Sequence, residues 1–320
     1  MCDKNSNFAA QKSSHLFFMF DNIDKILAET TERLSDLSFM EEKRLLHEYS
    51  DSTLIPSSNA LEEIVELSRS VFFPGFYGNT LIDSASGGPV KSIDAALKEL
   101  YQLLSAQIAA GLYVEERPKL GEECKTAIRA KGEQIAAEVI RQLPDIRTLL
   151  ITDVEAAFKG DPAAVTYGEV VTCYPAIRAL SIYRLAHVLH QLEVPLIPRM
   201  LTEIAHSETG IDIHPGAQIG SHFTIDHGTG VVIGATTIIG NNVKLYQGVT
   251  LGAKSFPLGK DGTPIKGILR HPILKDNVIV YSNATILGRV TIGEGAVIGG
   301  NLWITDDVPA GAVLTLEIKK

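Results

Sequence analysis

Aliphatic residues recur at every sixth position over the last third of the chain. The recurring positions are Ile213, Ile219, Ile225, Ile233, Ile239, Leu245, Leu251, Leu274, Val280, Ile286, Ile292, Ile298 and Ile304. A period of six fits neither a strand nor a helix alone, but it fits a chain that turns a corner every six residues. Three hexapeptides then make one triangular coil, with the aliphatic side chain inside. We therefore predict a left-handed parallel β-helix over residues 210–308, an exception to the usual right-handed crossover.

Two segments interrupt this repeat. Gly228-Thr229-Gly230 shifts the phase by two residues, and a polar segment rich in Gly and Pro separates Leu251 from Leu274. A packed prism has to extrude such a segment, so we expect a surface loop over residues 253–270. Polar residues with useful chemistry gather around both breaks.

The first part of the chain has a helical pattern. Apolar residues follow one another at three- and four-residue spacing, for example over residues 60–67 and 177–192. Glycine is sparse there, with 9 in residues 1–200 against 18 in residues 201–320.

These patterns predict an α+β protein in which an all-helical domain precedes the β-helix. We place the helical domain at residues 41–209 and the β-helix domain, with its extruded loop, at residues 210–320. Residues 1–40 carry a weaker pattern, typical of a mobile or weakly helical terminal segment.

Composition narrows the classes of protein. No stretch approaches the roughly 20 apolar residues of a membrane span, and Leu16-Phe17-Phe18-Met19-Phe20 is too short for a signal-peptide core. We therefore expect a cytoplasmic protein without a membrane partner. The three cysteines are scattered without a CxxC pair, which argues against a disulfide scaffold and a thiolate zinc site.

The charge balance argues against a nucleic-acid partner. The net charge is -9, and residues 201–320 carry 9 Lys and Arg against 10 Asp and Glu. A polynucleotide binder needs a basic face, which neither half of the chain offers.

The polar residues beside the two breaks suggest proton transfer. Asp226-His227 precedes the first break, and Asp212 lies fifteen residues before His227. With a coil of about eighteen residues, Asp212 and His227 fall on nearby faces of successive coils. A carboxylate beside an imidazole fixes its tautomer and raises its basicity, as a general base requires. Arg270-His271 ends the loop and offers a guanidinium for a carboxylate. The set suggests a site for a small zwitterion, although these side chains could instead cap the corners of the coils.

A zinc site is the weaker alternative. His222 and His227 are five residues apart, and a third ligand would have to come from His214 or from His187 in the helical part. We predict no metal. Asp161 by itself is typical of a turn or an N-cap, and His187 of a core or interface histidine.

Six motifs occur in a fixed order along the chain. They are Gly160-Asp161-Pro162-Ala163, Tyr183-Arg184-x-Ala186-His187, Ile211-Asp212-Ile213-His214-Pro215, Ile225-Asp226-His227-Gly228-x-Gly230, Val249-Thr250-Leu251-Gly252 and Arg270-His271-Pro272. Each is weak alone, but the ordered set resembles serine O-acetyltransferase of the hexapeptide-repeat acyltransferase superfamily. The resemblance is close over about residues 145–308 and looser upstream.

The resemblance implies transfer of acetyl from acetyl-CoA to the hydroxyl of L-serine, which gives O-acetyl-L-serine and CoA in the first step of cysteine biosynthesis. His227 would be the general base and Asp212 its orienting partner. Asp161 and Asp226 would hold the ammonium of serine, and Arg270 and His271 its carboxylate. The hydroxyl would attack the thioester directly, without a cofactor or a covalent enzyme intermediate.

The resemblance also implies coenzyme contacts and partners. Acetyl-CoA would lie along the prism, between neighbouring subunits, near Gly252, Ala253, Ser282 and Gly300, with a backbone N–H near Gly252-Ala253 as the oxyanion donor. The usual Gly-x-Gly-Ala coil is replaced by Tyr281-Ser282-Asn283-Ala284. The family forms homotrimers, in some members paired into hexamers, and L-cysteine inhibits at the serine site. Ile318 is not terminal here, so we do not expect a stable complex with O-acetylserine sulfhydrylase.

Two alternatives remain at this point. A hexapeptide acetyltransferase for another hydroxyl acceptor, such as a sugar or xenobiotic, would keep His227 but has no use for Asp161 together with Arg270-His271. A non-catalytic trimeric scaffold would release no thiol from acetyl-CoA.

Overall fold

The computed structural model describes residues 23–38, 54–77, 88–116, 122–255 and 257–316. The chain divides into two compact units, residues 1–50 and residues 51–320. In the first unit, residues 23–35 are helical. The prediction for residues 1–22 and 39–40 lies outside the described residues.

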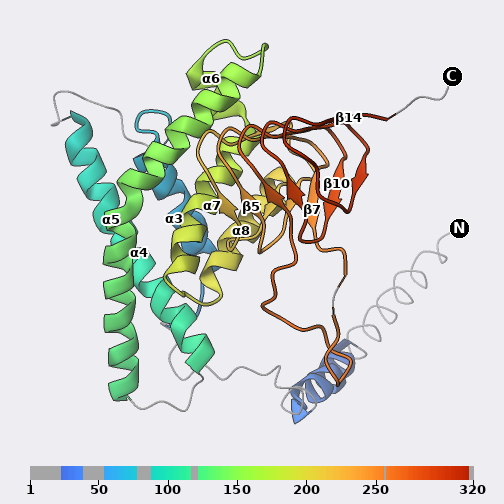
Figure 1. The fold of residues 1–320 in the computed structure, drawn as a ribbon. Helices are drawn as coiled ribbons and strands as arrows, with labels where there is room; N and C mark the ends of the chain where they lie inside the picture. Colours follow the sequence, from blue (N-terminus) through green and yellow to red (C-terminus); the bar gives the residue numbers. More distant parts are fainter. Residues whose placement is uncertain (1–22, 39–53, 78–87, 117–121, 256, 317–320) are drawn as a thin grey trace, which may run out of the picture. The chain divides into compact units, whose positions relative to one another are not determined.

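The second unit begins with helices, as the spacing of apolar residues predicts (Figure 1). The described helices are α3 (Ser58–Phe72), α4 (Gly88–Glu116), α5 (Glu122–Gly160), α6 (Tyr167–Cys173), α7 (Pro175–Gln191) and α8 (Ile197–Thr209). The helices begin and end at ordinary capping residues. The hydroxyl of Thr166 accepts from the backbone N–H of Glu169 and caps α6, and α8 ends at Gly210 in the left-handed region.

In the residues that the structure describes, fourteen short strands follow and form three parallel sheets. The first sheet contains β1 (Asp212–Ile213), β4 (Val232–Ile233), β7 (Thr250–Gly252), β10 (Thr285–Leu287) and β13 (Trp303–Ile304). The second contains β2 (Gln218–Ile219), β5 (Ile238–Ile239), β8 (Ile273–Leu274) and β11 (Thr291–Ile292). The third contains β3 (Thr224–Asp226), β6 (Lys244–Tyr246), β9 (Ile279–Val280), β12 (Val297–Ile298) and β14 (Val313–Leu314). Successive strands thus pass from sheet to sheet, and the predicted left-handed β-helix is confirmed (Figure 1).

The six-residue repeat forms the core of the prism. Eleven of the thirteen predicted positions are at most 3% exposed, and the other two, Ile219 and Ile304, pack against them as partly buried residues. Ile213, Ile233 and Leu251 are in register on adjacent strands of the first sheet. Stacking of equivalent aliphatic side chains therefore explains the period of six.

The register locates both interruptions. Asp212 pairs with Val232, a step of 20 residues, whereas the next step, from Val232 to Thr250, is 18. The two extra residues lie at Gly228-Thr229-Gly230, between β3 and β4. The step from Thr250 to Thr285 is 35, and its extra residues lie between β7 and β8. In the described part of that segment, the pairing is an isolated bridge between Leu258 and Pro264.

Helix α7 covers the open end of the first coil. Backbone N–H groups of each coil donate to carbonyls of the next coil, for example from Gln218 to Thr237. The carbonyls of the first coil have no preceding coil to donate to them and therefore need other donors. Side chains of α7 donate to four of them. The donors are Tyr183 to Ala217 (2.6 Å), Arg184 to Ile219 (3.4 Å) and Gly220 (2.9 Å), and the ring Nδ1 of His187 to Pro215 (2.7 Å).

A buried ion pair joins α5 and α7 beneath this coil. Arg184 donates from two nitrogens to both carboxylate oxygens of Asp153, at 2.7 and 2.9 Å. Asp153 is fully buried and also accepts from the backbone N–H of Phe223, immediately before β3. The pair therefore fixes the entry of β3, the strand that ends at Asp226.

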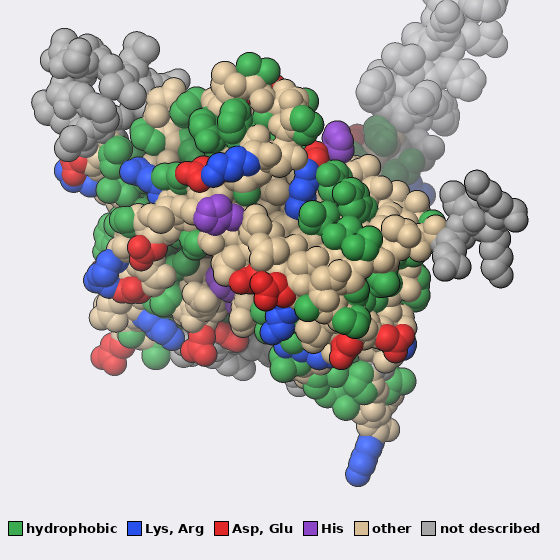
Figure 2. Space-filling view, turned by 45° about the horizontal axis from the view of Figure 1, so that its top comes forward, with side chains coloured by type: hydrophobic (Ala, Val, Ile, Leu, Met, Phe, Trp, Pro, Cys, Tyr) green, Lys and Arg blue, Asp and Glu red, His purple; other side chains and the backbone are tan. Residues whose placement is uncertain are grey.

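The surface carries mixed charge. Figure 2 shows a face on which basic and acidic side chains are interspersed, and the described part of that face has no continuous basic patch. Among the helices that the structure describes, none is long and apolar enough to cross a bilayer.

Candidate active site

A pocket of about 280 Å³ lies where the end of α5 meets the third sheet. It is lined by Asp161, Tyr174, Pro175, Ala176, Ile225, Asp226 and His227. Three of the predicted site residues, Asp161, Asp226 and His227, therefore come together, although 65 residues separate the first two in the sequence.

Asp161 immediately follows the last residue of α5. Its Oδ1 accepts from the backbone N–H of Ala163 at 2.8 Å, which forms the predicted turn, and its Oδ2 accepts from the hydroxyl of Tyr174. These hydrogen bonds, that of Tyr174 first, hold the pKa of Asp161 below its ordinary value. The same contact raises the pKa of Tyr174 to about 12. The pocket therefore contains a carboxylate that stays charged near neutral pH.

Asp226 and His227 project outward where β3 ends. Residues alternate along the strand, so Ile225 points into the core and Asp226 away from it. His227 has φ 58° and a side chain that is 75% exposed, with Nε2 3.9 Å from Oδ1 of Asp226. The next residue, Gly228, has φ 94°, which favours glycine, and a Cβ there would lie 2.5 Å from Cδ1 of Ile211. The tight corner thus presents the imidazole to solvent beside a carboxylate.

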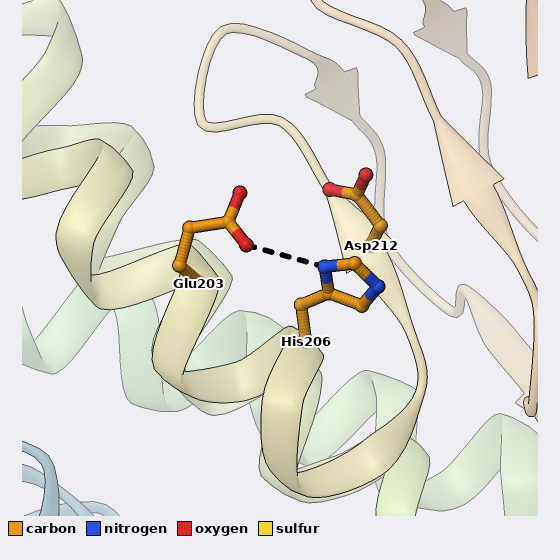
Figure 3. A group of neighbouring side chains, drawn as sticks. All are labelled: Glu203, His206 and Asp212. Atoms are coloured by element: carbon orange, nitrogen blue, oxygen red, sulfur yellow. Dashed lines mark hydrogen bonds and ion pairs between the residues drawn. The ribbon is translucent and has the colours of Figure 1, made fainter.

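Asp212 does not line this pocket. Its carboxylate is 3.7 Å from the guanidinium of Arg199 on α8, and it neighbours His206 and Glu203 (Figure 3). In the described residues no hydrogen bond or ion pair joins Asp212 to His227, so their pairing stays a prediction. Asp212 begins a strand of the first sheet, and His227 follows the third-sheet strand from which the chain crosses to the first sheet. The two residues therefore lie on successive coils at the same corner of the prism, where Gly230 donates to the carbonyl of Gly210.

The cluster of Figure 3 does not suit a cation. Arg199 forms ion pairs with both Glu203 and Asp212, so these carboxylates already have a cationic partner. The histidines considered for zinc are not gathered in the described part of the chain either. His214, His222 and His227 follow strands of the first, second and third sheets and so occupy three different corners of the prism.

Arg270 and His271 lie just before β8, at the corner between the first and second sheets. The hydroxyl and the backbone N–H of Thr236 donate to Nδ1 of His271, at 2.8 and 3.1 Å, so the ring proton is on Nε2. The ring lies over Gly234, where a Cβ would be 2.1 Å from it. Burial, then Arg270 and Arg289, lower the pKa of His271 to about 4. The imidazole is therefore neutral at pH 7 and presents a donor.

The predicted site is consequently split between two corners of the prism. Asp226 and His227 occupy the corner after the third sheet, and Arg270 and His271 the corner between the first and second. His214 belongs to the second group, because it follows β1 at the same corner between the first and second sheets. One chain does not bring the two groups together.

The predicted coenzyme residues are also placed at these corners. Gly252 ends β7 and Ala253 follows it, on the corner of Arg270 and His271. Ser282 and Gly300 follow strands of the third sheet, and a Cβ at Gly300 would lie 3.0 Å from the carbonyl oxygen of Ser282. Tyr281 stacks on Tyr246 with ring centroids 5.0 Å apart.

Two side chains that contact the pocket carboxylates were not predicted. Tyr174 precedes a helix and holds Asp161, and Lys244 lies 3.0 Å from Asp226. For Lys244 the sequence does carry a signal, because it occupies an outward position of the hexapeptide repeat, one residue before the inward Leu245.

Two neutral histidines make stability depend on pH. Burial first, then nearby cations led by Arg199, lower the pKa of His214 from an ordinary value of 6.5 to about 4. The pKa of His271 is lowered to the same value. Between these values the unfolded chain binds protons that the folded chain does not. The free energy of unfolding should therefore fall as pH falls from 6.5 toward 4, by at most about 1.4 kcal/mol per pH unit and histidine, and by less where solvent reaches the ring.

Urea denaturation across about pH 5 to 7 measures this slope. His214→Asn, which keeps an acceptor for the backbone N–H of Gly216, should reduce it, and His206→Asn on exposed α8 should not. A slope unchanged by His214→Asn would contradict the prediction.

Known proteins are similar to this chain in sequence and in fold. Residues 271–306 match the bacterial transferase hexapeptide family (six repeats). The chain is 45% identical over 262 residues to "Serine acetyltransferase, plasmid" of Synechococcus elongatus, covering 82% of each protein. It is 42% identical over 161 residues to serine acetyltransferase of Bacillus subtilis, covering 50% of this chain and 70% of that one. The crystal structure of Entamoeba histolytica serine acetyltransferase 1 in complex with L-cysteine superimposes with a TM-score of 0.69 at 34% identity, over 79% of this chain and 86% of that one.

Proposed function

The chain belongs to the serine acetyltransferase family, and from this premise we propose that it transfers the acetyl group of acetyl-CoA to the hydroxyl of L-serine, yielding O-acetyl-L-serine and CoA. The observation that carries the proposal is the pocket in which the imidazole of His227 stands beside the carboxylates of Asp161 and Asp226. The product would supply cysteine biosynthesis.

In this mechanism His227 removes the proton of the serine hydroxyl. A serine hydroxyl is a poor nucleophile until a neighbouring base takes its proton as it attacks. The oxygen then adds to the thioester carbonyl, and collapse of the tetrahedral intermediate expels CoA as a thiolate, which takes up a proton. Asp161 and Asp226 bind the substrate ammonium, and the fixed charge of Asp161 supports this role.

A neighbouring copy completes the site. The carboxylate of serine needs a cationic partner, and Arg270 and His271 lie on a different corner of the prism from His227. We place these two residues on the adjacent subunit of a homotrimer, whereas Asp212, on the same corner as His227, would orient the imidazole. The buried, neutral ring of His271 would then donate a hydrogen bond from Nε2–H to the substrate carboxylate.

Acetyl-CoA would bind as a co-substrate in the cleft between subunits. A backbone N–H near Gly252-Ala253 would donate to the oxyanion, and Ser282 and Gly300 lie on adjacent coils along which the coenzyme would extend. L-Cysteine differs from serine only at the side-chain heteroatom, so we propose that it competes for the same pocket. The related E. histolytica enzyme, crystallised with L-cysteine, supports this.

Release of free CoA thiol from acetyl-CoA, with and without L-serine, tests the proposed function. Serine-dependent release would support it. Release that depends on a different hydroxyl compound would favour the alternative acceptor, and no acceptor-dependent release from folded protein would favour a scaffold.

Arg270→Ala should act mainly on serine binding. Loss of the guanidinium removes a charge-assisted hydrogen bond to the substrate carboxylate, so the KM for L-serine should rise by about 10-fold or more, with a much smaller change in the KM for acetyl-CoA. Steady-state kinetics with each substrate varied in turn gives both constants. Equal damage to both would assign the arginine to the coenzyme or to the order of the loop.

A further inference from the structure

We propose that Lys244 is a positioning residue of the serine pocket, which ties the end of α5 to the end of β3 and so fixes Asp161 relative to Asp226. The inference rests on the proposed function, because it assigns Lys244 a part in binding serine. None of the six motifs of the resemblance contains this residue.

The contacts of Lys244 bridge two elements. Its Nζ lies 3.0 Å from Oδ2 of Asp226 and donates at 2.8 Å to the carbonyl of Gly160, the last residue of α5. The contact with Gly160 spans 84 residues of sequence. Asp161 is the next residue along the chain. One ammonium group therefore contacts Asp226 directly and the backbone next to Asp161.

The packing of Lys244 restricts the conformation of its side chain. Lys244 lies in β6, in register with Thr224 of β3, one coil below Asp226. Its ammonium is 4.5 Å from the centroid of the Tyr246 ring, and its side chain is only 16% exposed. A cation held over an aromatic face and between two acceptors has little freedom to leave.

The charges support the same role. Asp161 and Asp226 carry two negative charges in one small pocket, and the side chain of Asp226 is itself only 20% exposed. Lys244 compensates one of them, which leaves a net single negative charge for the single ammonium of serine. Burial opposes the charge of Lys244, but Tyr246 and Asp226 more than offset it, so its pKa is raised and it stays cationic.

Loss of the bridge should therefore impair serine more than acetyl-CoA. Lys244→Met keeps the length and apolar stem but removes the charge and both hydrogen bonds. We expect the KM for L-serine to rise about tenfold and the KM for acetyl-CoA to change less than about twofold. Lys244→Arg should recover most of the loss, because a guanidinium can donate to two acceptors at once.

The experiment measures both KM values in the wild type, Lys244→Met, Lys244→Arg and the matched control Lys275→Met, an exposed lysine on another corner of the prism. Lys244→Gln serves as a second neutral variant if Lys244→Met does not fold. The same lysine substitution in the Asp226→Asn background tests the route, and there its effect should shrink to less than about threefold.

The outcomes separate the two proposals. A serine KM that is unchanged or lowered in folded Lys244→Met, an equal rise in both KM values, or an undiminished effect in the Asp226→Asn background would overturn the positioning role while leaving the proposed function intact. Wild-type protein without serine-dependent thiol release would overturn the proposed function and this inference with it.

Discussion

His227→Ala should lower the turnover number about 10²–10⁴-fold, the span typical of removing a general base. The imidazole is the exposed basic group of the pocket and stands 3.9 Å from Asp226 at a corner that holds it outward. Without it, the serine hydroxyl must lose its proton to water in the transition state. Because Asp161 still binds the ammonium, the KM for L-serine should change far less than kcat.

Thiol release at saturating concentrations of both substrates measures the loss. His222→Asn is a suitable control, since that histidine follows β2 at another corner of the prism, outside the pocket, and has a φ of 56° that Asn adopts readily. The far-UV circular dichroism and melting temperature of both variants should match the wild type. Undiminished turnover of folded His227→Ala would rule out the role as base, and a loss confined to KM would make the histidine a binding residue.

Arg184→Met should lower the free energy of unfolding by about 3–5 kcal/mol, the range for breaking one side of a buried ion pair. The substitution leaves the carboxylate of Asp153, which is fully buried, without its cation. It also removes the donor to the carbonyls of Ile219 and Gly220 at the open end of the first coil. Both losses act on the junction between the helices and the prism.

Urea denaturation at pH 7 measures this effect. Arg178→Met is the matched control, because Arg178 pairs with Glu66 and Glu208 near the surface, where ion pairs contribute at most about 1 kcal/mol. The double variant Arg184→Met with Asp153→Leu should recover part of the stability, since it leaves no buried charge unpaired. If Arg184→Met cost no more than Arg178→Met, the buried pair would not hold the junction.

Much of the fold could be predicted from the sequence because every coil of the prism repeats the same six-residue pattern. Each inward aliphatic residue packs on its equivalent one coil away, so Ile233 and Leu251 report the same geometry independently. The pairing of Asp212 with His227 stays a prediction. The spacing assumed a constant coil of 18 residues, whereas the first coil has 20, and the described residues show no direct contact between the two side chains.

The site was only partly readable, because its contacts cross long stretches of sequence. Asp161 and Asp226 were expected from the resemblance, and the structure places them in one pocket. Tyr174 has no repeat or motif to mark it, and the outward repeat position of Lys244 does not show which groups its side chain contacts. Their roles depend on how the end of α5 meets the third sheet, and no local pattern encodes that packing.

The covering of the first coil by α7 also bears on aggregation. A stack of identical parallel coils has complementary ends, so the last coil of one molecule could in principle extend the first coil of another into a filament. Here Tyr183, Arg184 and His187 already occupy carbonyls on which such a filament would have to grow. Helix α7 thus blocks end-to-end stacking of the β-helix, so that the repeat does not polymerise through its first coil.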